Sequence, residues 1–435
     1  MTYPSSARAW TMTVLLTLAY ILSYVDRSIL GLLIEPIKSD LKLTDAQLSL
    51  IMGPAFGLVY AFMGLPLGWL ADRARRGWIV AAGIALWSLA TAASGLARDF
   101  WHLFAARMGV GVGEATLSPC AMSMIGDSFP PEQRGKPVAV YNAALALGSG
   151  IASLIGAGVL IWAKTSSGIE LPIVGELRPW QFAFFLVGVP GFVLALLFLI
   201  LPEPPRQPVT DRAIASGGFG ATMAYVWDRR GAFIGLTAMV SVMTTIAYSH
   251  GFMPSVFVRT YGWEVKDYAL ANALITLALG PATVTGIGAL ADRWRKAGIA
   301  DAPFRLVIAA FCMMVVVCAL QPLMPTAELA LVFVGLSTIS IGAMTASGII
   351  ALLDIAPSNV RGQIVALYYM TISIAGLGLG PTTVGYLSTK VYGEAHLNWA
   401  VATVPVIYGI IPLLLIPVVR AAYMRQLAQL RGASV

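Results

Sequence analysis

Four ionisable residues lie inside long apolar stretches in the first third of the chain, and two of them are adjacent. Asp26 and Arg27 interrupt an apolar stretch that begins near Trp10, and Arg107 and Glu114 lie in a later one. An ionised side chain at the centre of a bilayer costs at least about 2.5–3.5 kcal/mol and is usually functional. Neighbouring residues on a helix point about 100° apart. Asp26 and Arg27 therefore need separate partners elsewhere in the protein.

Arg107 and Glu114 are expected on one face of a helix, because seven residues is only about 20° short of two full turns. Glu114 is expected roughly 20 Å from the end of its helix near Trp101, which is close to mid-membrane. Arg27 reaches a comparable depth. We therefore predict that Arg27 points toward Glu114, and that Asp26 turns toward Arg107 or a neighbouring helix.

Such a cluster of opposite charges can take up and release protons. A buried carboxylate gains a proton when burial penalises its charged form, and loses the proton when an arginine approaches. Asp26 and Glu114 are therefore the predicted proton-coupling residues. Arg27 and Arg107 are predicted to switch them or to bind an anionic head group. The alternative is a static buried ion network that only fixes helix packing.

The composition indicates that the elements holding these residues cross a membrane. The 435-residue chain is 58% hydrophobic and only 11% charged, whereas soluble domains are about 25% charged. Its mean hydropathy is +0.79. The formal net charge of +7 does not indicate a nucleic-acid partner, because the basic residues are scattered singly between apolar segments.

Twelve apolar segments are long enough to cross a bilayer, which takes roughly 20 residues. The first six are expected at about 10–34, 47–70, 77–97, 101–126, 137–163 and 180–201. The other six are expected at about 231–258, 268–290, 304–324, 328–353, 363–389 and 398–420. The sequence thus predicts an all-α membrane protein of two six-helix bundles, 1–201 and 231–435, joined by a Pro-, Gly- and charge-rich linker, 202–230.

The distribution of Lys and Arg predicts the orientation. The two termini, and the loops expected on the same side of the membrane as the termini, hold more than twice as many Lys and Arg residues as the loops expected on the opposite side. We therefore expect both termini and the linker to be cytoplasmic, in a plasma or bacterial inner membrane. The first apolar stretch is expected to remain as an uncleaved span. The three cysteines lie in apolar runs and predict no disulfide. No metal or cofactor is expected.

Two motifs recur in the second half of the chain. GWLADRARRG (68–77) matches GALADRWRKAG (288–298), and DSFPPEQRGKPVAVY (127–141) matches DIAPSNVRGQIVALY (354–368). Two independent motifs at nearly equal offsets indicate duplication. Parallel six-span halves are typical of transporters, in which the substrate site lies at the interface of the halves near the membrane midplane.

These motifs resemble the major facilitator superfamily over essentially the whole chain. G-x-L-A-D-R-x-x-R-R after the second span is the signature loop of that superfamily. Within it, YVDR (24–27) and RMGVGVGEATLSPCAMSMIGDSF (107–129) resemble the spinster family of lipid transporters, in which an arginine, a glycine ladder and a Gly-Glu-Ala step recur in the fourth span. Proton-coupled organic-anion symporters of the superfamily share the Asp-Arg pair and a fourth-span carboxylate.

The resemblance also implies a cytoplasmic gate. In the superfamily, the signature Asp and Arg form a charge relay with the acid that ends the fourth span. Carried over, Asp72 faces the N-terminus of the eleventh span, and Arg73 or Arg76 pairs with Asp127. The repeat extends the predicted gate to Asp292, Arg293 and Asp354. The alternative is that these basic loops only orient the protein in the membrane.

The second half differs from the first because its spans carry no Asp, Glu, Lys or Arg at depth. His250 is the ionisable residue there, and it could bind substrate, sense pH, or simply form a hydrogen bond between helices. Besides the two arginines, the predicted substrate-contacting residues are Tyr24, Tyr60, Asn142, His250, Tyr368 and Tyr369. Core packing or interfacial anchoring is the alternative for the tyrosines.

A cavity with one charged and one largely apolar wall favours an amphiphile. We therefore predict an alternating-access transporter that moves a lipid-like substrate with an anionic head group. We expect this transport to be coupled to protons, and the protein to be a monomer surrounded by membrane lipids. The alternative is a proton-coupled symporter of small organic anions. An enzyme acting on lipids is disfavoured, because His102 and His396 are expected near span ends, away from any matching nucleophile. A receptor would not need two symmetric gate motifs.

Overall fold

The computed structural model describes residues 3–130, 133–165, 169–171, 175–206, 219–357 and 360–432, and they are nearly all helical. The chain forms two compact units. The first comprises 1–208 together with two later segments, 251–277 and 385–397. The second comprises 209–250, 278–384 and 398–435.

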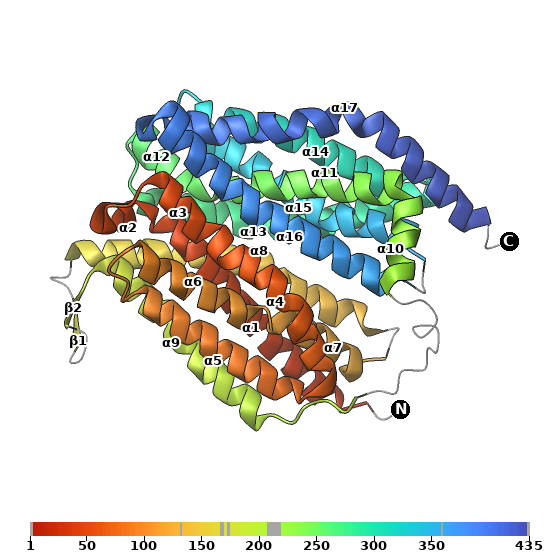
Figure 1. The fold of residues 1–435 in the computed structure, drawn as a ribbon, viewed down its shortest axis with the longest axis horizontal. Coiled ribbons are helices and arrows are strands. Elements are labelled where there is room, and N and C mark those ends of the chain that lie inside the picture. Colours follow the sequence, from red (N-terminus) through yellow and green to blue (C-terminus); the bar gives the residue numbers. More distant parts are fainter. Residues whose placement is uncertain are drawn as a thin grey trace. The chain divides into compact units, whose positions relative to one another are not determined.

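The first unit contains long helices that run roughly side by side in Figure 1. They are α1 (Ser6–Leu32), α4 (Pro54–Arg73), α5 (Arg76–Ser94), α6 (Phe100–Glu114), α7 (Leu117–Ser128), α8 (Gly135–Thr165) and α9 (Pro179–Ile200). Two short helices, α2 (Ile34–Leu41) and α3 (Asp45–Met52), join α1 to α4. A hairpin of β1 (Ile169–Leu171) and β2 (Gly175–Leu177) lies between α8 and α9. Helix α12 (Met253–Tyr261) and a π-helical segment, Leu387–Tyr392, also belong to this unit.

The second unit is built from α10 (Phe219–Asp228), α11 (Arg230–Ser249), α14 (Ala302–Leu320), α15 (Ala327–Ile355), and most of α16 (Arg361–Tyr386) and α17 (Leu397–Gly432). Helix α13 (Val265–Lys296) contributes to both units. The core of the second unit is apolar and includes a stacked pair, Phe304 and Tyr423, with ring centroids 4.5 Å apart. The sequence interpretation of 202–230 as a linker did not anticipate α10.

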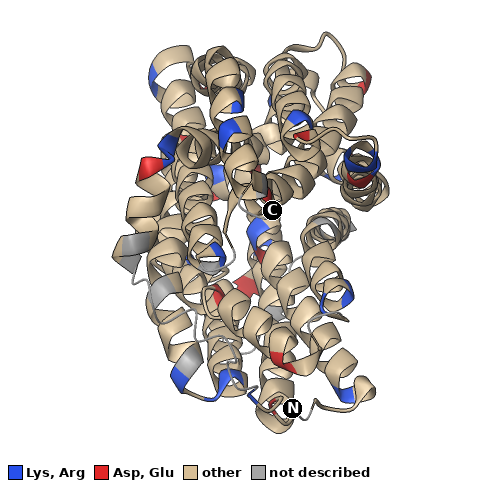
Figure 2. Ribbon diagram, turned by 90° about the vertical axis from the view of Figure 1, so that its right-hand side faces the viewer, with Lys and Arg blue, Asp and Glu red and all other residues tan. Residues whose placement is uncertain are grey.

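Eleven helical segments of the described chain are long and apolar enough to cross a membrane. Large apolar side chains of these segments are exposed, for example Val193 and Ile200 of α9. Such exposure is expected of helices that contact lipid. Most of the ribbon in Figure 2 carries neither Lys, Arg, Asp nor Glu. The expected fourth span is absent from these eleven because it is divided between two shorter helices, α6 and α7. With it, the predicted all-α membrane architecture of the twelve-helix type is confirmed.

The expected fourth span, 101–126, is divided into α6 and α7 by a turn directly after Glu114. The amide of Thr116 donates to the carbonyl oxygen of Gly113 at 3.2 Å, and its hydroxyl donates to the same oxygen at 2.8 Å. A β-carbon on Gly113 would lie 2.6 Å from the carbonyl oxygen of Gly83 on α5. The glycine therefore lets α6 approach α5 closely and fixes Glu114 beside this contact.

Asp301 anchors the second unit at the start of α14. Its side chain is buried, Arg305 Nε donates to one carboxylate oxygen at 2.8 Å, and Arg420 Nε donates to the other at 2.9 Å. Burial alone raises the pKa of Asp301, but the hydrogen bonds from Arg420 and Arg305 outweigh it and hold the pKa below its usual value of 3.8.

We expect Asp301→Asn to lower the free energy of unfolding by about 1–2 kcal/mol, because both arginines are half-exposed and screened. A carboxylate with a depressed pKa in the folded state stabilises above its unfolded pKa. The wild-type advantage should therefore be full at neutral pH and fade as the pH falls through the folded-state pKa, below 3.8. Thermal unfolding in detergent at several pH values tests this. Asp292→Asn, at an exposed position, is the control; equal effects of the two substitutions would refute the anchor.

Candidate functional site

Arg27 of α1 and Glu114 of α6 form a buried ion pair. Arg27 Nε and Nη2 lie 2.6 and 2.5 Å from Glu114 Oε2. The hydroxyl of Ser23, one turn before Arg27, donates to the same oxygen at 2.7 Å. The Glu114 side chain is fully buried, and that of Arg27 is 13% exposed. The structure thus brings together Arg27 and Glu114, which we predicted to face each other because of their comparable depth in the membrane.

Three aromatic rings surround the Arg27 guanidinium. Its central carbon lies 5.1 Å from the ring centroid of Tyr24, 4.5 Å from that of Phe56 and 4.8 Å from that of Tyr60. Aromatic faces attract a cation at these distances, and more strongly in a desolvated site. The rings therefore stabilise the positive charge of Arg27 whether or not Glu114 is ionised.

Asp26 and Arg107 form a second buried pair. Arg107 Nη1 lies 3.3 Å from Asp26 Oδ1, and the hydroxyl of Thr91 on α5 donates to Asp26 Oδ2 at 2.8 Å. The guanidinium carbon of Arg107 lies 5.7 Å from the Phe56 centroid. Phe56 thus contacts the arginines of both pairs. The two pairs therefore lie in one largely buried environment, in which electrostatic interactions between them are strong.

Two polar atoms of this cluster remain unsatisfied among the described residues. Glu114 Oε1 and Arg107 Nε are buried without a hydrogen-bond partner there. A buried polar atom left unpaired costs about 1–3 kcal/mol, and such atoms call for an explanation. A proton on Glu114 Oε1 would remove the negative charge from the oxygen that has no donor. The pair therefore has two conceivable charge states, an ion pair and a neutral acid beside a cation.

The other residues predicted to contact substrate lie in different environments. Tyr24 and Tyr60 contact Arg27, whereas Asn142 of α8 is exposed. In the second unit, His250 Nδ1 lies 2.9 Å from the carbonyl oxygen of Ile246, one turn earlier, as expected for a histidine that caps its own helix. The remaining two are Tyr368, which is buried, and Tyr369, which is 50% exposed. The structure gathers only the two tyrosines beside Arg27 into the charge cluster.

Arg76 is the centre of the predicted cytoplasmic gate in the first unit. Its buried guanidinium contacts the Asp127 carboxylate, Glu203 Oε1 at 2.6 Å and the hydroxyl of Ser123 at 2.8 Å. Arg73 instead lies over the Trp69 ring at 4.2 Å and is exposed. Of the two arginines proposed as partners for Asp127, the structure therefore selects Arg76. The side chain of Asp72 lies outside the described part of the structure.

In the repeated motif of the second unit, the ion pair uses a different arginine. Arg295 Nη2 lies 2.6 Å from each carboxylate oxygen of Asp354, whereas Asp292 and Arg293 are exposed. Arg295 occupies the position of Arg75 in the repeat, so the pairing is shifted by one residue relative to the first unit. Sequence reasoning named Asp354 but missed this partner.

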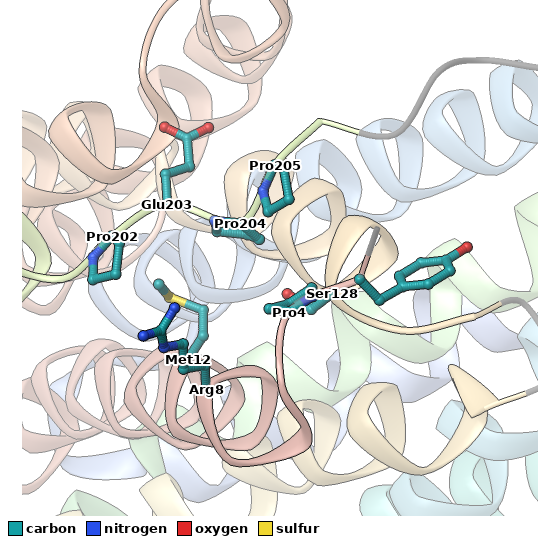
Figure 3. Close-up of a pocket in the computed structure, with 9 residues that line it drawn as sticks. Pro4, Arg8, Met12, Ser128, Pro202, Glu203, Pro204 and Pro205 are labelled. Atoms are coloured by element: carbon teal, nitrogen blue, oxygen red, sulfur yellow. The ribbon is translucent and has the colours of Figure 1, made fainter. Parts of the chain in front are cut away.

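A pocket of about 240 Å³ lies near the gate, between the start of α1 and the first residues after α9 (Figure 3). Glu203, which binds Arg76, borders it, and Arg8 of α1 also lines it. Much of the remaining lining is proline: Pro4, Pro202, Pro204 and Pro205. The pocket contains none of the four residues of the buried charge cluster.

Sequence reasoning missed an ion cluster at the opposite end of the first unit. Asp45 of α3, whose side chain is fully buried, accepts hydrogen bonds from Arg259 of α12 at 2.7 and 2.9 Å and from Lys38 of α2 at 2.6 Å. Arg259 Nε also donates to Glu35 at 2.9 Å, and Lys38 Nζ to Glu394 at 2.6 Å. We call these five residues the outer cluster. It ties helices of the first six spans to segments of the last six.

Comparison with known proteins shows the family to which the chain belongs. Residues 16–377 match the family described as the Major Facilitator Superfamily, which is most of the chain. The chain belongs to the Major Facilitator Superfamily. This is a family of multi-pass membrane transporters rather than enzymes, and the superfamily expected from the signature loop is confirmed.

Relatives within the superfamily have different named activities. The chain is 32% identical over 294 residues to an MFS-type efflux pump of Mycolicibacterium smegmatis, covering 66% of this chain and 63% of the relative. It is 30% identical to a probable L-galactonate transporter of Escherichia coli, over 44% of this chain and 39% of the relative. It is 27% identical to protein spinster of Drosophila melanogaster, over 45% and 30%. Each match thus spans less than two thirds of the relative.

Among solved structures, the chain is similar to a bacterial homologue of the human lysosomal transporter spinster in an inward-facing, unoccupied conformation. The TM-score is 0.80 at 23% identity, and the alignment covers 98% of each chain. This similarity shows that the chain shares the fold of that structure over nearly all of its length. Together with the spinster relatives, it supports the resemblance to spinster proteins.

Proposed function

We propose that this transporter moves an amphiphile with an anionic head group and couples that movement to protons. The observation that carries the proposal is the buried Arg27–Glu114 pair with an unpartnered Glu114 oxygen in the described structure. While Glu114 is ionised, its carboxylate forms an ion pair with the Arg27 guanidinium, which is the group that would bind an anionic head. Protonation neutralises the acid and makes Arg27 available, still held by its aromatic neighbours.

Proton and anion therefore favour each other's binding in this scheme. With Glu114 protonated, the cluster of Asp26, Arg27, Arg107 and Glu114 carries one net positive charge, and an anion restores neutrality. Because linkage is reciprocal, a bound anion also favours the protonated acid. The expected coupling is symport of the anion with a proton. An anion leaving Arg27 would allow Glu114 to release its proton and re-form the ion pair.

The choice of an amphiphile rests on the uneven distribution of polar groups. The second half carries no carboxylate, lysine or arginine at depth in its spans. Hydroxyls that could line a polar wall instead donate to carbonyl oxygens of their own helix, as Ser337, Thr338, Ser340 and Thr345 do. Methyl groups and glycines are thus left to meet a hydrocarbon tail. The similarity to spinster proteins supports the same choice.

A proton-coupled symporter of small organic anions is the second candidate. The similarity to a probable L-galactonate transporter favours it. In that case, the same Arg27 would bind the carboxylate of a water-soluble acid. The two candidates differ in what the rest of the substrate must be, and this difference can be measured.

We expect affinity to rise with tail length in a series of amphiphiles that share one anionic head. Each methylene moved from water into an apolar wall contributes about 0.8 kcal/mol, or roughly fourfold in Kd, until the pocket is filled. Calorimetric titration of the purified protein measures this. A neutral-head analogue of the best binder is the control and should bind more weakly, because Arg27 would lose its anion. A Kd that does not change with tail length would favour the organic-anion symporter.

Two sets of ion pairs are suited to act as gates. We assign Arg76, Asp127 and the repeated-motif pair Arg295–Asp354 to the cytoplasmic gate, with Asp72, Arg73, Asp292 and Arg293 as further members proposed from the sequence. We assign the outer cluster to the opposite gate. Alternating access then requires that these sets break and form in turn.

A further inference from the structure

Helix α10 lies at one end of the second unit, directly before a membrane span. Arg229, with φ −111° and ψ 26°, interrupts the helix between α10 and α11. Figure 1 shows α10 turning away from the direction of α11 and lying across the end of the unit. Since α11 begins a candidate span at Arg230, the connection fixes α10 at the depth of a membrane surface. The charge distribution predicts that this surface is cytoplasmic.

One side of α10 is held by the ends of other helices of the second unit. The hydroxyl of Thr222 donates to Gln363 Oε1 of α16 at 2.5 Å, and Gln426 Nε2 of α17 donates to the hydroxyl of Tyr225 at 2.7 Å. Val226 is buried in the apolar core of the unit. These contacts fix the rotation of α10 about its axis.

The other side of α10 is apolar, yet exposed among the described residues. Met223 is 37% exposed and Trp227 is 63% exposed, and residues four apart on a helix share a face. The guanidinium carbon of Arg230 lies 5.8 Å from the Trp227 ring centroid, and that of Arg229 lies 4.1 Å from the Tyr225 centroid. The face thus combines exposed apolar side chains with one cation, Arg230, and a second cation, Arg229, lies at the same end of α10 beside Tyr225. Together the two arginines outnumber the neighbouring acid, Asp228.

We propose that this face of α10 binds the head groups of anionic phospholipids in the cytoplasmic leaflet. Tryptophan is enriched at the boundary between head groups and acyl chains, and a helix lying on a membrane buries its apolar face there. Arg229 and Arg230 stand at the same level, where they meet lipid phosphates. The charge complementarity selects anionic over zwitterionic lipid. The proposal does not depend on which substrate is transported.

The test uses the full-length protein reconstituted in nanodiscs of mixed phosphatidylglycerol and phosphatidylcholine. Native mass spectrometry after release reports the ratio of the two lipids retained. A second readout is the accessibility of a spin label at Met223→Cys, in a background where the three native cysteines are replaced by alanine. Oxygen reaches labels within lipid, and a water-soluble nickel complex reaches labels in water.

We expect Arg229→Gln/Arg230→Gln to lower the retained phosphatidylglycerol preference by roughly fivefold per arginine, and less in high salt. Arg425→Gln, at an exposed arginine elsewhere in the second unit, should change it little. Trp227→Leu should weaken retention, whereas Trp399→Leu, at another exposed tryptophan, should not. The spin label should be more accessible to oxygen than to nickel.

Three results would overturn the proposal. An unchanged lipid ratio in the double arginine variant would show that the arginines do not contact head groups. A label more accessible to nickel would place the face in water. A label reached by neither reagent would show that protein covers the face.

Discussion

Replacing Glu114 with glutamine is expected to reduce proton-driven transport to background while leaving the protein folded and able to bind substrate. Glutamine is nearly isosteric and can keep the hydrogen bond from Ser23, but it cannot exchange a proton or form an ion pair with Arg27. Arg27 should therefore stay available to the anion at every pH. Uptake into proteoliposomes under an imposed pH gradient measures the loss.

Glu328→Gln is the matched control, because it removes the same charge from an exposed position in the first turn of α15. It should leave proton-driven uptake near the wild-type rate. If Glu114→Gln kept its response to the pH gradient, Asp26 would have to carry the proton. If the variant failed to fold, Ser23→Ala offers a milder test, since it removes one donor to the same Glu114 oxygen.

Breaking the outer cluster should produce the second large effect. Asp45 is fully buried and accepts hydrogen bonds from Arg259, Lys38 and Ser388. Removing one partner of a buried ion pair costs about 3–5 kcal/mol, because the other charge is left uncompensated. Arg259→Gln should therefore shift the equilibrium away from the state in which this end is closed, by a factor of about 100 or more.

Distances between spin labels at the exposed positions Lys42→Cys and Asp267→Cys would report the shift. Lys390→Gln, an exposed lysine of the π-helical segment, should leave the distances unchanged. The charge-swapped pair, Asp45→Arg with Arg259→Asp, should restore part of the closed population. Distances that do not respond to Arg259→Gln would mean that the cluster only stabilises the fold and does not act as a gate.

The sequence predicted the buried pairs because two rules act together. Charges within spans must find partners, and helical spacing places Arg107 and Glu114 on one face. Arg27 and Asp26 then had few possible partners, and the structure joins Arg27 to Glu114 and Asp26 to Arg107. The lengths of the apolar segments likewise predicted the twelve-span architecture, and the repeat and the signature loop supported it. The buried pairs and the twelve spans depend on helical spacing, on the lengths of apolar segments and on repeated motifs, all of which can be read from a single sequence.

Other parts of the site depend on contacts that periodicity does not encode. Phe56, which contacts both arginines, looks like any apolar residue of a span. Asp45 and Arg259 are 214 residues apart, and charges near span ends are indistinguishable from those that only orient loops. Glu203 lies in a proline-rich segment that reads as linker, and its contact with Arg76 had no sequence signal.

The turn after Glu114 was not predicted, although the sequence holds a signal for it: Pro119 cannot donate a helical hydrogen bond to Ala115, four residues earlier, where the turn lies. Asn142, a polar residue beside Tyr141 that we predicted to contact substrate, is exposed, and its role as a substrate contact remains a prediction. The boundaries proposed for the two bundles and the linker remain predictions.

The most direct test of the central claim is the pH dependence of equilibrium binding. Calorimetric titration of the purified wild type with an anionic-head amphiphile, at several pH values, measures whether Glu114 and the anion compete for Arg27. We expect affinity to increase as the pH falls and each binding event to take up protons from the buffer, while Glu114→Gln binds with a pH-independent affinity. Wild-type affinity that stays constant or weakens as the pH falls, with no proton uptake, would contradict the claim.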